Sequence, residues 1–305
     1  MNSARIVLGT AQLGRDGDAV AFALLDEYVG LGGTVLDTAS AYHLFRPGIR
    51  SEEIIGEWLR ARGRPPGLAI VSKGAHPLRE ARDVQRCDAA SIRADIDLSL
   101  RRLGVEQIDL WYMHRDDPRL PVADIVGVLR ELVGEGKIAR FGCSNWTLPR
   151  LREALALPGQ SFVANQVLGN LFCETMVPFD GPNNVALDAP TFRTTIDAGL
   201  TLDAYGGTAD GYFEKRARGD APPSSYDTPA SAGVADRISA IAAREGLAPG
   251  HLALAFLLHL SPQIRALIGP RSPEQLRQSW PAGAIELTPE LVREIAGAAE
   301  MHAYI

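Results

Sequence analysis

The sequence predicts an α/β protein whose fold is a single (β/α)8 barrel, the TIM barrel, over residues 1–305. Three observations predict this fold. Short apolar runs alternate with longer segments whose apolar residues recur at helical spacing. Eight such runs occur, as a closed barrel requires. Most of them are continuously apolar, which is typical of parallel strands covered on both faces. A doubly wound sheet is the second fold that the pattern allows.

The eight expected strands share a short length and an apolar interior. They are residues 6–9, 34–37, 69–73, 109–113, 139–143, 162–165, 201–205 and 266–268. No stretch rich in proline and glycine separates two cores, so the pattern favours one domain over two.

The segments between these strands carry helix signals. Ile92, Ile96, Leu100 and Leu103 follow the spacing of one helix face. Pro121 can start a helix whose apolar stripe is Ile125, Val128, Leu129 and Leu132.

Two further helix starts are visible as capping residues. Ser51 is expected to be an N-cap, with the acidic Glu52 and Glu53 favourable in the first turn. Thr288 is expected to cap the last helix in the same way.

Two longer polar stretches follow the sixth and seventh strands. Residues 206–233 read as a structureless loop after strand seven, and residues 173–189 as a second loop after strand six. Loops at the carboxyl ends of barrel strands surround the active site, so we expect both stretches to act as lids over a substrate.

Composition narrows the class of protein. The chain has 31 Lys and Arg against 37 Asp and Glu, a net charge of −6, and no dense basic run, which argues against nucleic acid as a partner. The most apolar stretch is too short to span a bilayer, so no membrane partner is expected. Three widely spaced cysteines fit a reducing cytoplasm better than a disulfide framework. The oligomeric state cannot be read from the sequence.

Polar side chains stand where the expected strands end. Because function in a barrel gathers at these ends, we expect them to meet at one mouth. They are Asp37, Thr38, Ser72, Lys73, His114, Ser144, Asn145, Asn165, Gln166 and Tyr205.

The chemistry of four of the titratable groups fits together. A tyrosine such as Tyr42 has an ordinary pKa near ~10, and a neighbouring Lys73 would lower that pKa by stabilising the tyrosinate. Asp37 would keep the lysine charged, and His114 would orient a carbonyl oxygen. Such a set can protonate a carbonyl oxygen while hydride reaches the carbon. Each residue alone also has an ordinary structural explanation, as a turn residue, a solvated charge or a core side chain.

These residues lie in segments that resemble the aldo-keto reductase family over nearly the whole chain. The most specific segment runs from Gly33 to Tyr42, GTVLDTASAY, and is followed by SEEIIG from Ser51. The other matching segments are IVSK (70–73), DLWYMH (109–114), FGCSNW (141–146) and IGPRSPEQL (268–276).

The resemblance implies a fold, an activity and roles for individual residues. It implies a barrel that reduces carbonyl compounds with a nicotinamide cofactor. Tyr42 would be the general acid, Lys73 would depress its pKa, Asp37 would pair with Lys73, and His114 would orient the substrate. Further residues would hold the cofactor: Thr10, Asp37, Ser144, Asn145, Gln166, Tyr205 (stacked on the nicotinamide), Gly269, Arg271, Ser272, Gln275 and Ser279.

The segment after strand eight bears on the choice of cofactor. Arg271 can pair with a 2′-phosphate, which favours NADP(H), with NAD(H) as the other possibility. Ser272 and Gln275 also form a capping box, a purely structural role. Ser279 and Gln278 depart from the asparagine and glutamate that many members carry there. The Gly-rich stretch 30–33 precedes a strand and is not a Rossmann motif.

Four residues are candidates for contact with substrate. Phe45, Arg46 and Arg50 follow Tyr42, and Trp146 follows Asn145. The arginines could bind a sugar-like or anionic carbonyl compound, whereas the alternative is a solvated loop. Arg115 could face substrate or solvent. The sequence shows no metal-binding spacing.

Three functional hypotheses remain open from the sequence. The first is an NADPH-dependent carbonyl reductase, with alcohol or sugar oxidation as its reverse. The second is a nicotinamide-binding regulatory or redox-sensing barrel with little turnover. The third is a lyase or isomerase that forms a Schiff base on Lys73. The substrate and the direction in the cell are not determined by the residues.

Overall fold

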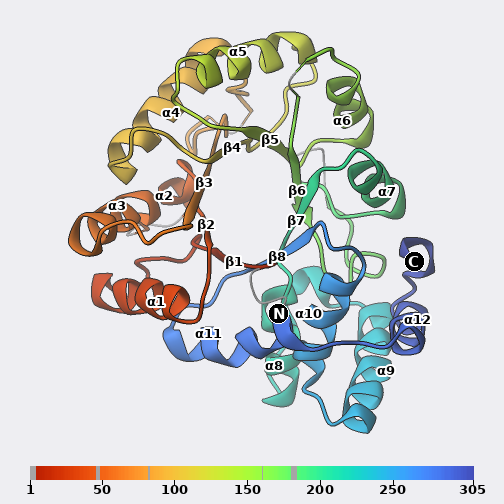
Figure 1. Ribbon diagram of the computed structural model, residues 1–305. Coiled ribbons are helices and arrows are strands. Elements are labelled where there is room, and N and C mark those ends of the chain that lie inside the picture. Colours follow the sequence, from red (N-terminus) through yellow and green to blue (C-terminus); the bar gives the residue numbers. More distant parts are fainter. Residues whose placement is uncertain (1–4, 46–48, 82, 160, 180–183) are drawn as a thin grey trace. The chain divides into compact units, whose positions relative to one another are not determined.

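The computed structural model confirms the predicted fold class. It describes residues 5–45, 49–81, 83–159, 161–179 and 184–305. Eight parallel strands follow one another in sequence order round a closed barrel, and helices alternate with them (Figure 1). The strands are β1 (Ile6–Gly9), β2 (Val35–Asp37), β3 (Ala69–Gly74), β4 (Leu110–Met113), β5 (Phe141–Ser144), β6 (Ala164–Leu168), β7 (Thr201–Tyr205) and β8 (Ile264–Ile268).

The helices occupy the connections between strands. They are α1 (Asp18–Gly30), α2 (Tyr42–Phe45), α3 (Ser51–Arg62), α4 (Ala89–Leu103), α5 (Val122–Gly134), α6 (Leu148–Leu155), α7 (Ala189–Asp197), α8 (Tyr212–Ala217), α9 (Pro229–Glu245), α10 (Pro249–His259), α11 (Pro273–Ser279) and α12 (Pro289–Ala298). Short 3-10 turns are η2 (Ala209–Gly211), η3 (Ser224–Tyr226), η4 (Trp280–Ala284) and η5 (His302–Tyr304).

Strands β5 and β6 begin two residues later than the sequence pattern suggests. Their register explains the difference, since Trp111 of β4 pairs with Phe141, and Ser144 pairs with Gln166. The apolar pattern in the sequence indicates which residues can be buried. The hydrogen bonds to the neighbouring strand determine which of them belong to the strand. The shift places the polar residues Ser144 and Gln166 inside strands.

One of the two predicted N-caps is wrong. Arg50 occupies the cap position of α3, and Ser51 is already helical, with its hydroxyl donating to the carbonyl of Thr10 at 2.6 Å. Ser51 therefore ties α3 to the segment after β1 and does not cap its own helix. Thr288 does cap α12, because its side chain accepts from the backbone amide of Leu291.

Residues 206–233 are not structureless, as the sequence suggested. They contain η2, α8, η3 and the start of α9. Three aromatic side chains in this stretch surround Phe172, with ring centroids at 4.5 Å for Tyr212, 5.7 Å for Phe213 and 5.6 Å for Tyr226. The stretch is polar overall, and its aromatic residues pack on Phe172, which precedes it in the chain, so the sequence pattern did not indicate the cluster. Whether this stretch and residues 173–189 act as lids stays a prediction.

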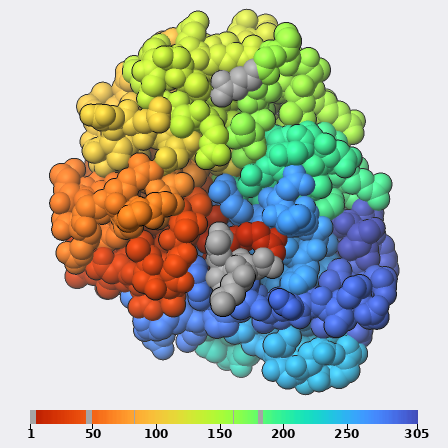
Figure 2. Space-filling view, in the orientation of Figure 1, coloured from red at the N-terminus to blue at the C-terminus, as the bar shows by residue number. Residues whose placement is uncertain are grey.

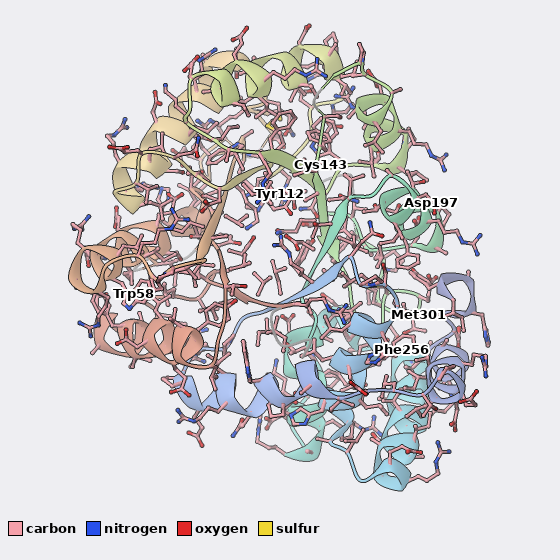
Figure 3. The ribbon with its side chains drawn as sticks, viewed as in Figure 1. Trp58, Tyr112, Cys143, Asp197, Phe256 and Met301 are labelled. Atoms are coloured by element: carbon pink, nitrogen blue, oxygen red, sulfur yellow. The ribbon has the colours of Figure 1, made fainter. Side chains whose placement is uncertain are left out.

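Tertiary contacts divide the chain into two compact units. The first unit comprises residues 7–166 and 269–276, and the second comprises residues 1–6, 167–268 and 277–305. In the second unit, Phe256 on α10 and Met301 near the C-terminus are buried side chains (Figure 3). Arg265 of β8 forms a two-pronged ion pair with Asp203 of β7.

In the first unit, the helices pack on one another outside the strands. Helices α3, α4 and α5 follow one another on its surface, from orange to yellow-green in Figure 2. Trp58 of α3, labelled in Figure 3, donates from Nε1 to Asp26 of α1 at 2.7 Å. Tyr112 and Cys143, also labelled there, lie on the neighbouring strands β4 and β5. The three cysteines, Cys87, Cys143 and Cys173, are free thiols.

Within the described ranges, no single helix has both the length and the apolar character needed to cross a membrane. Helices α9 and α10 meet those criteria only as a pair, and they are bent by 96° at the break between them.

Gly56 sets the distance between α3 and α4, which makes it a test of the fold. A Cβ at this position would lie 2.2 Å from the backbone carbonyl oxygen of Arg102, and backbone cannot move aside as a flexible side chain can. We expect Gly56→Ala to destabilise the protein by about 2 kcal/mol or more, measured as the free energy of unfolding in urea.

Gly127→Ala in α5 is the matched control, because nothing lies within 4 Å of the Cβ it would add. It should be neutral or stabilising by about 0.5 kcal/mol through higher helix propensity. Equal effects of the two substitutions would contradict the packing argument.

Candidate active site

A buried ion pair lies where β2 and β3 end. Lys73 Nζ donates to Asp37 Oδ1 at 2.5 Å, and each side chain is at most 2% exposed. Gln166 of β6 donates from Nε2 to Asp37 Oδ2 at 2.9 Å. The three side chains predicted to meet therefore do so, although Gln166 lies inside β6 and not at its end, and both oxygens of the Asp37 carboxylate are occupied.

The Lys73 ammonium has two further acceptors. It donates to the carbonyl oxygen of Thr38 at 2.7 Å and to the Tyr42 hydroxyl at 3.0 Å. Burial lowers the pKa of Lys73, but Asp37 and Tyr42 raise it by more, so the net pKa lies above its ordinary value. A protonated lysine with three acceptors has no lone pair for a Schiff base, which argues against the lyase or isomerase hypothesis.

The net pKa of Tyr42 is opposite in direction to the sequence prediction. Burial raises it, Lys73 lowers it, and the pKa ends above its ordinary value. The lysine acts in the predicted direction, but the cost of burying a tyrosinate outweighs it. Tyr42 is consequently a neutral, protonated hydroxyl at physiological pH.

His114 completes the group of titratable side chains. Its ring lies edge-on to that of Tyr42, with centroids 6.1 Å apart and planes at 79°. Burial, followed by the charge of Arg115, holds the pKa of His114 well below its usual range, so the imidazole is neutral. Nδ1 of this ring is buried and has no hydrogen-bond partner within the part of the chain that the structure describes. A neutral ring with an unsatisfied nitrogen beside Tyr42 fits a site for a carbonyl oxygen.

Sequence reasoning missed Glu52 as part of this site. The Glu52 carboxyl accepts from Ser72 at 2.7 Å, next to Lys73, and pairs with Arg102, which donates to the carbonyl of Ser40 at 3.1 Å. This network holds the segment between Asp37 and Tyr42. The SEEIIG motif was the available signal, but it was read only as a favourable helix start.

His76 is the second residue that was missed. Its ring centroid lies 5.0 Å from that of His114, at an angle of 61°. Its Nδ1 interacts with the carbonyl of Pro77 at 2.8 Å. Burial, with the nearby charge of Arg115, lowers its pKa to about 4. The sequence alone gave no reason to separate it from the other scattered histidines.

Three polar residues predicted to hold the nicotinamide carboxamide lie together, Ser144 and Asn145 at the end of β5 and Gln166 within β6. Asn145 has a left-handed φ of 59°, and its backbone amide donates to the carbonyl of Gln166 at 3.0 Å. Its Nδ2 donates to Ser144 Oγ at 3.0 Å. Amide and hydroxyl groups that converge in this way offer both the donors and the acceptors that a carboxamide needs.

The predicted residue in the segment after β1 has a defined partner. Thr10 is buried and donates from Oγ1 to the carbonyl of Asp37 at 2.9 Å, so its hydroxyl supports the end of β2.

The predicted residues in the segment after β8 also have defined partners. Ser272 Oγ accepts from the Gln275 amide at 3.3 Å, while Gln275 Oε1 accepts from the Arg271 amide at 2.8 Å, and the two bonds form a reciprocal cap at the start of α11. Arg271 pairs with Asp16. At Gly269, the nearest atom to an added Cβ is the Gly9 carbonyl oxygen at 4.0 Å.

The other predicted residues are outside the first unit, outside the described residues, or paired elsewhere. Tyr205, the last residue of β7, and Ser279, the last of α11, belong to the second unit, so their cofactor roles stay predictions. Arg46 and the side chain of Phe45 lie outside the described residues. Arg50 pairs with Asp18, Glu53 and Glu57, which favours the structural explanation for it.

Trp146, predicted to wall the substrate pocket, is fully buried instead. It donates from Nε1 to the Arg115 carbonyl at 3.2 Å and packs edge-on to Phe162. Its position supports the backbone after His114, and its indole is not exposed to a pocket surface. Among the residues that the structure describes, no group of three or more His, Cys, Asp and Glu could hold a metal ion.

Three comparisons with known proteins lead to one family. A model of the aldo/keto reductase family matches residues 5–300. The "Aldo-keto reductase str7" of Strobilurus tenacellus is 28% identical over 96% of this chain and 87% of its own length. The Schizosaccharomyces pombe aldo-keto reductase yakc, whose name includes NADP(+), is 28% identical over 91% of this chain and 82% of its own. The crystal structure of the thermostable aldo-keto reductase Tm1743 with epalrestat gives a TM-score of 0.71 at 23% identity, covering 97% of this chain and 94% of that one.

The lowered pKa of His76 predicts a pH-dependent stability. As pH falls below about 6.5, unfolded His76 binds a proton that folded His76 does not bind until about pH 4. Folding stability is thus present above the unfolded pKa and is lost as pH decreases. Between pH 7 and 5, the wild type should lose about 2 kcal/mol more unfolding free energy than His76→Gln does.

Urea unfolding at each pH measures this difference. His302→Gln is the control, because it makes the same substitution at an exposed histidine. If wild type and His76→Gln lose stability in parallel, the neutral form of His76 is not what the fold requires.

Proposed function

The chain belongs to the aldo/keto reductase family, and we propose that it reduces an aldehyde or ketone to an alcohol with NADPH, using Tyr42 as the general acid. One observation carries this proposal. The Tyr42 hydroxyl is hydrogen-bonded to Lys73, which is paired with Asp37, and it stands beside the neutral ring of His114.

Tyr42 gives its proton to the carbonyl oxygen. Its raised pKa keeps it protonated until the oxygen becomes basic, and Lys73 then stabilises the tyrosinate that remains. Asp37 keeps Lys73 charged and in place through the transfer, with Gln166 fixing the other carboxylate oxygen. Water can return a proton to Tyr42 after the alcohol leaves.

His114 orients the substrate. Since its imidazole is neutral, it can donate one hydrogen bond to the carbonyl oxygen without competing for the proton that Tyr42 supplies. The edge-on arrangement with Tyr42 allows both groups to approach the same oxygen.

The described residues fit a nicotinamide cofactor. Bound NADPH supplies the hydride that adds to the carbonyl carbon. Ser144, Asn145 and Gln166 would hold the carboxamide, and Arg271 would pair with a 2′-phosphate, which favours NADPH over NADH. The printed name of the S. pombe relative supports the same preference. We also keep two cofactor contacts from the sequence prediction. Tyr205 would stack on the nicotinamide ring, and Ser279 would contact the cofactor from the segment after β8.

Two related functions share this site. Oxidation of an alcohol is the same chemistry in reverse and depends on the ratio of NADP⁺ to NADPH. A regulatory barrel with little turnover would need the cofactor groups but has no need of a Tyr42–Lys73–Asp37 chain, which is why we prefer the reductase. Three free thiols support a reducing compartment such as the cytoplasm.

Tyr42→Phe tests the general acid. The substitution removes only the hydroxyl, so we expect NADPH to bind as before and kcat for aldehyde reduction to fall by about 10²–10⁴-fold. Titration of protein fluorescence with NADPH measures binding, and the decrease in NADPH absorbance measures turnover.

Tyr28→Phe is the control. The Tyr28 hydroxyl is hydrogen-bonded to the backbone of Val35, so its loss should reduce stability without a comparable loss of kcat. Unchanged kcat in Tyr42→Phe would remove Tyr42 as the acid. A wild type that binds NADPH tightly but reduces none of a panel of aldehydes, ketones and sugars would favour the regulatory alternative.

A further inference from the structure

An exposed ion pair joins the segment after β1 to the segment after β8. Arg271 donates from Nε to Asp16 Oδ2 at 2.9 Å and from Nη2 to Asp16 Oδ1 at 2.7 Å. The side chains are 42% and 37% exposed. The pair borders a small hollow that Leu13, Gly14, Val20 and Pro270 also line. Both partners belong to the first unit of the chain.

The two ends of this pair are held differently. The backbone of Arg271 is fixed by the reciprocal cap with Gln275 at the start of α11. Asp16 lies in a turn between two glycines in the left-handed region, Gly14 with a φ of 90° and Gly17 with a φ of 95°. No atom lies within 4 Å of a Cβ added to Gly17. The turn is closed by a hydrogen bond from the Gly17 amide to the Gly14 carbonyl at 3.2 Å, so it is the side chain of Asp16 that would have to turn away from Arg271.

Asp16 occupies one of the two faces of the Arg271 guanidinium that can bind a phosphate through two donors, the face formed by Nε and Nη2. A guanidinium binds carboxylate and phosphate in the same way, through two parallel N–H donors such as Nε and Nη2. Only one anion can take that face at a time. Exposed pairs of this kind contribute little to stability, so a phosphate can displace the carboxylate.

The displaced carboxylate also remains an anion. Arg271 holds the pKa of the Asp16 carboxyl below its ordinary value. Asp16 thus stays ionised at neutral pH, and beside a bound 2′-phosphate it would be a like charge at short range. NADH carries a neutral 2′-hydroxyl at the corresponding place, which requires neither displacement nor proximity of two anions.

From this geometry we propose that Asp16 is a specificity-determining residue that weakens the binding of NADPH relative to NADH by competing with the 2′-phosphate for Arg271. The inference rests on the proposed function, because that proposal assigns the 2′-phosphate to Arg271. Arg271 would favour NADPH and Asp16 would oppose it, so removing the Asp16 carboxylate should increase the preference for NADPH.

Asp16→Asn tests the competition through binding rather than turnover. The dissociation constants of NADPH, NADH, 2′,5′-ADP and ADP are measured by calorimetry for the folded full-length protein. We expect Asp16→Asn to tighten NADPH and 2′,5′-ADP about 3- to 10-fold and to change NADH and ADP less than about twofold. The gain should shrink as salt is raised, because the pair is exposed.

Three further variants isolate the interaction. Arg271→Gln should weaken NADPH, and in that background Asp16→Asn should tighten it by less than in the wild type, because the competition is gone and only the like-charge repulsion remains. Glu290→Gln removes the carboxylate of another exposed arginine pair, Arg293–Glu290, and should leave all four dissociation constants unchanged.

Two other outcomes would contradict either the role of Asp16 or the proposed function. If NADPH and NADH both bind and Asp16→Asn leaves their ratio unchanged, or weakens NADPH, Asp16 does not compete, and the reductase proposal stands without it. If the wild type binds neither NADPH nor NADH, the proposed function fails and this inference fails with it.

Discussion

The buried charge of Lys73 is the constraint on which the site depends. An ammonium taken out of water is tolerated only if it is paired and hydrogen-bonded. Asp37, the Thr38 carbonyl and the Tyr42 hydroxyl meet that requirement together. The interaction that makes Lys73 compatible with burial therefore also fixes the Tyr42 hydroxyl, which we propose as the proton donor. Gln166 completes the arrangement from β6 by binding the second oxygen of Asp37.

Packing around this pair explains residues that carry no chemistry themselves. The Ser51 hydroxyl holds α3 to the segment after β1, and Glu52 links Ser72 to Arg102. Gly56 lets α3 approach the backbone of α4. In this chain the SEEIIG motif thus supplies positioning contacts from one helix, through Ser51, Glu52 and Gly56, next to the buried Asp37–Lys73 pair.

The sequence and the structure agree most closely where a strand ends in a polar residue. Asp37, Lys73, His114, Asn145 and Gln166 were all expected near one another, because parallel strands in a barrel place their carboxyl ends on one side. Agreement is poorer for residues whose role depends on a partner distant in sequence. Nothing local in Ser51, Glu52 or Trp146 reveals that they bind Thr10, Ser72 and Arg115.

The sequence by itself determined the barrel, the order of its elements and the residue types at the strand ends, because periodicity and residue type are local properties of the chain. Only the tertiary structure decided the protonation states and the pairing of charges. The net pKa of Tyr42 follows from burial competing with Lys73, and the state of Arg271 follows from Asp16, which is remote in sequence. Desolvation and ion pairing depend on distances in space, which residue order does not specify.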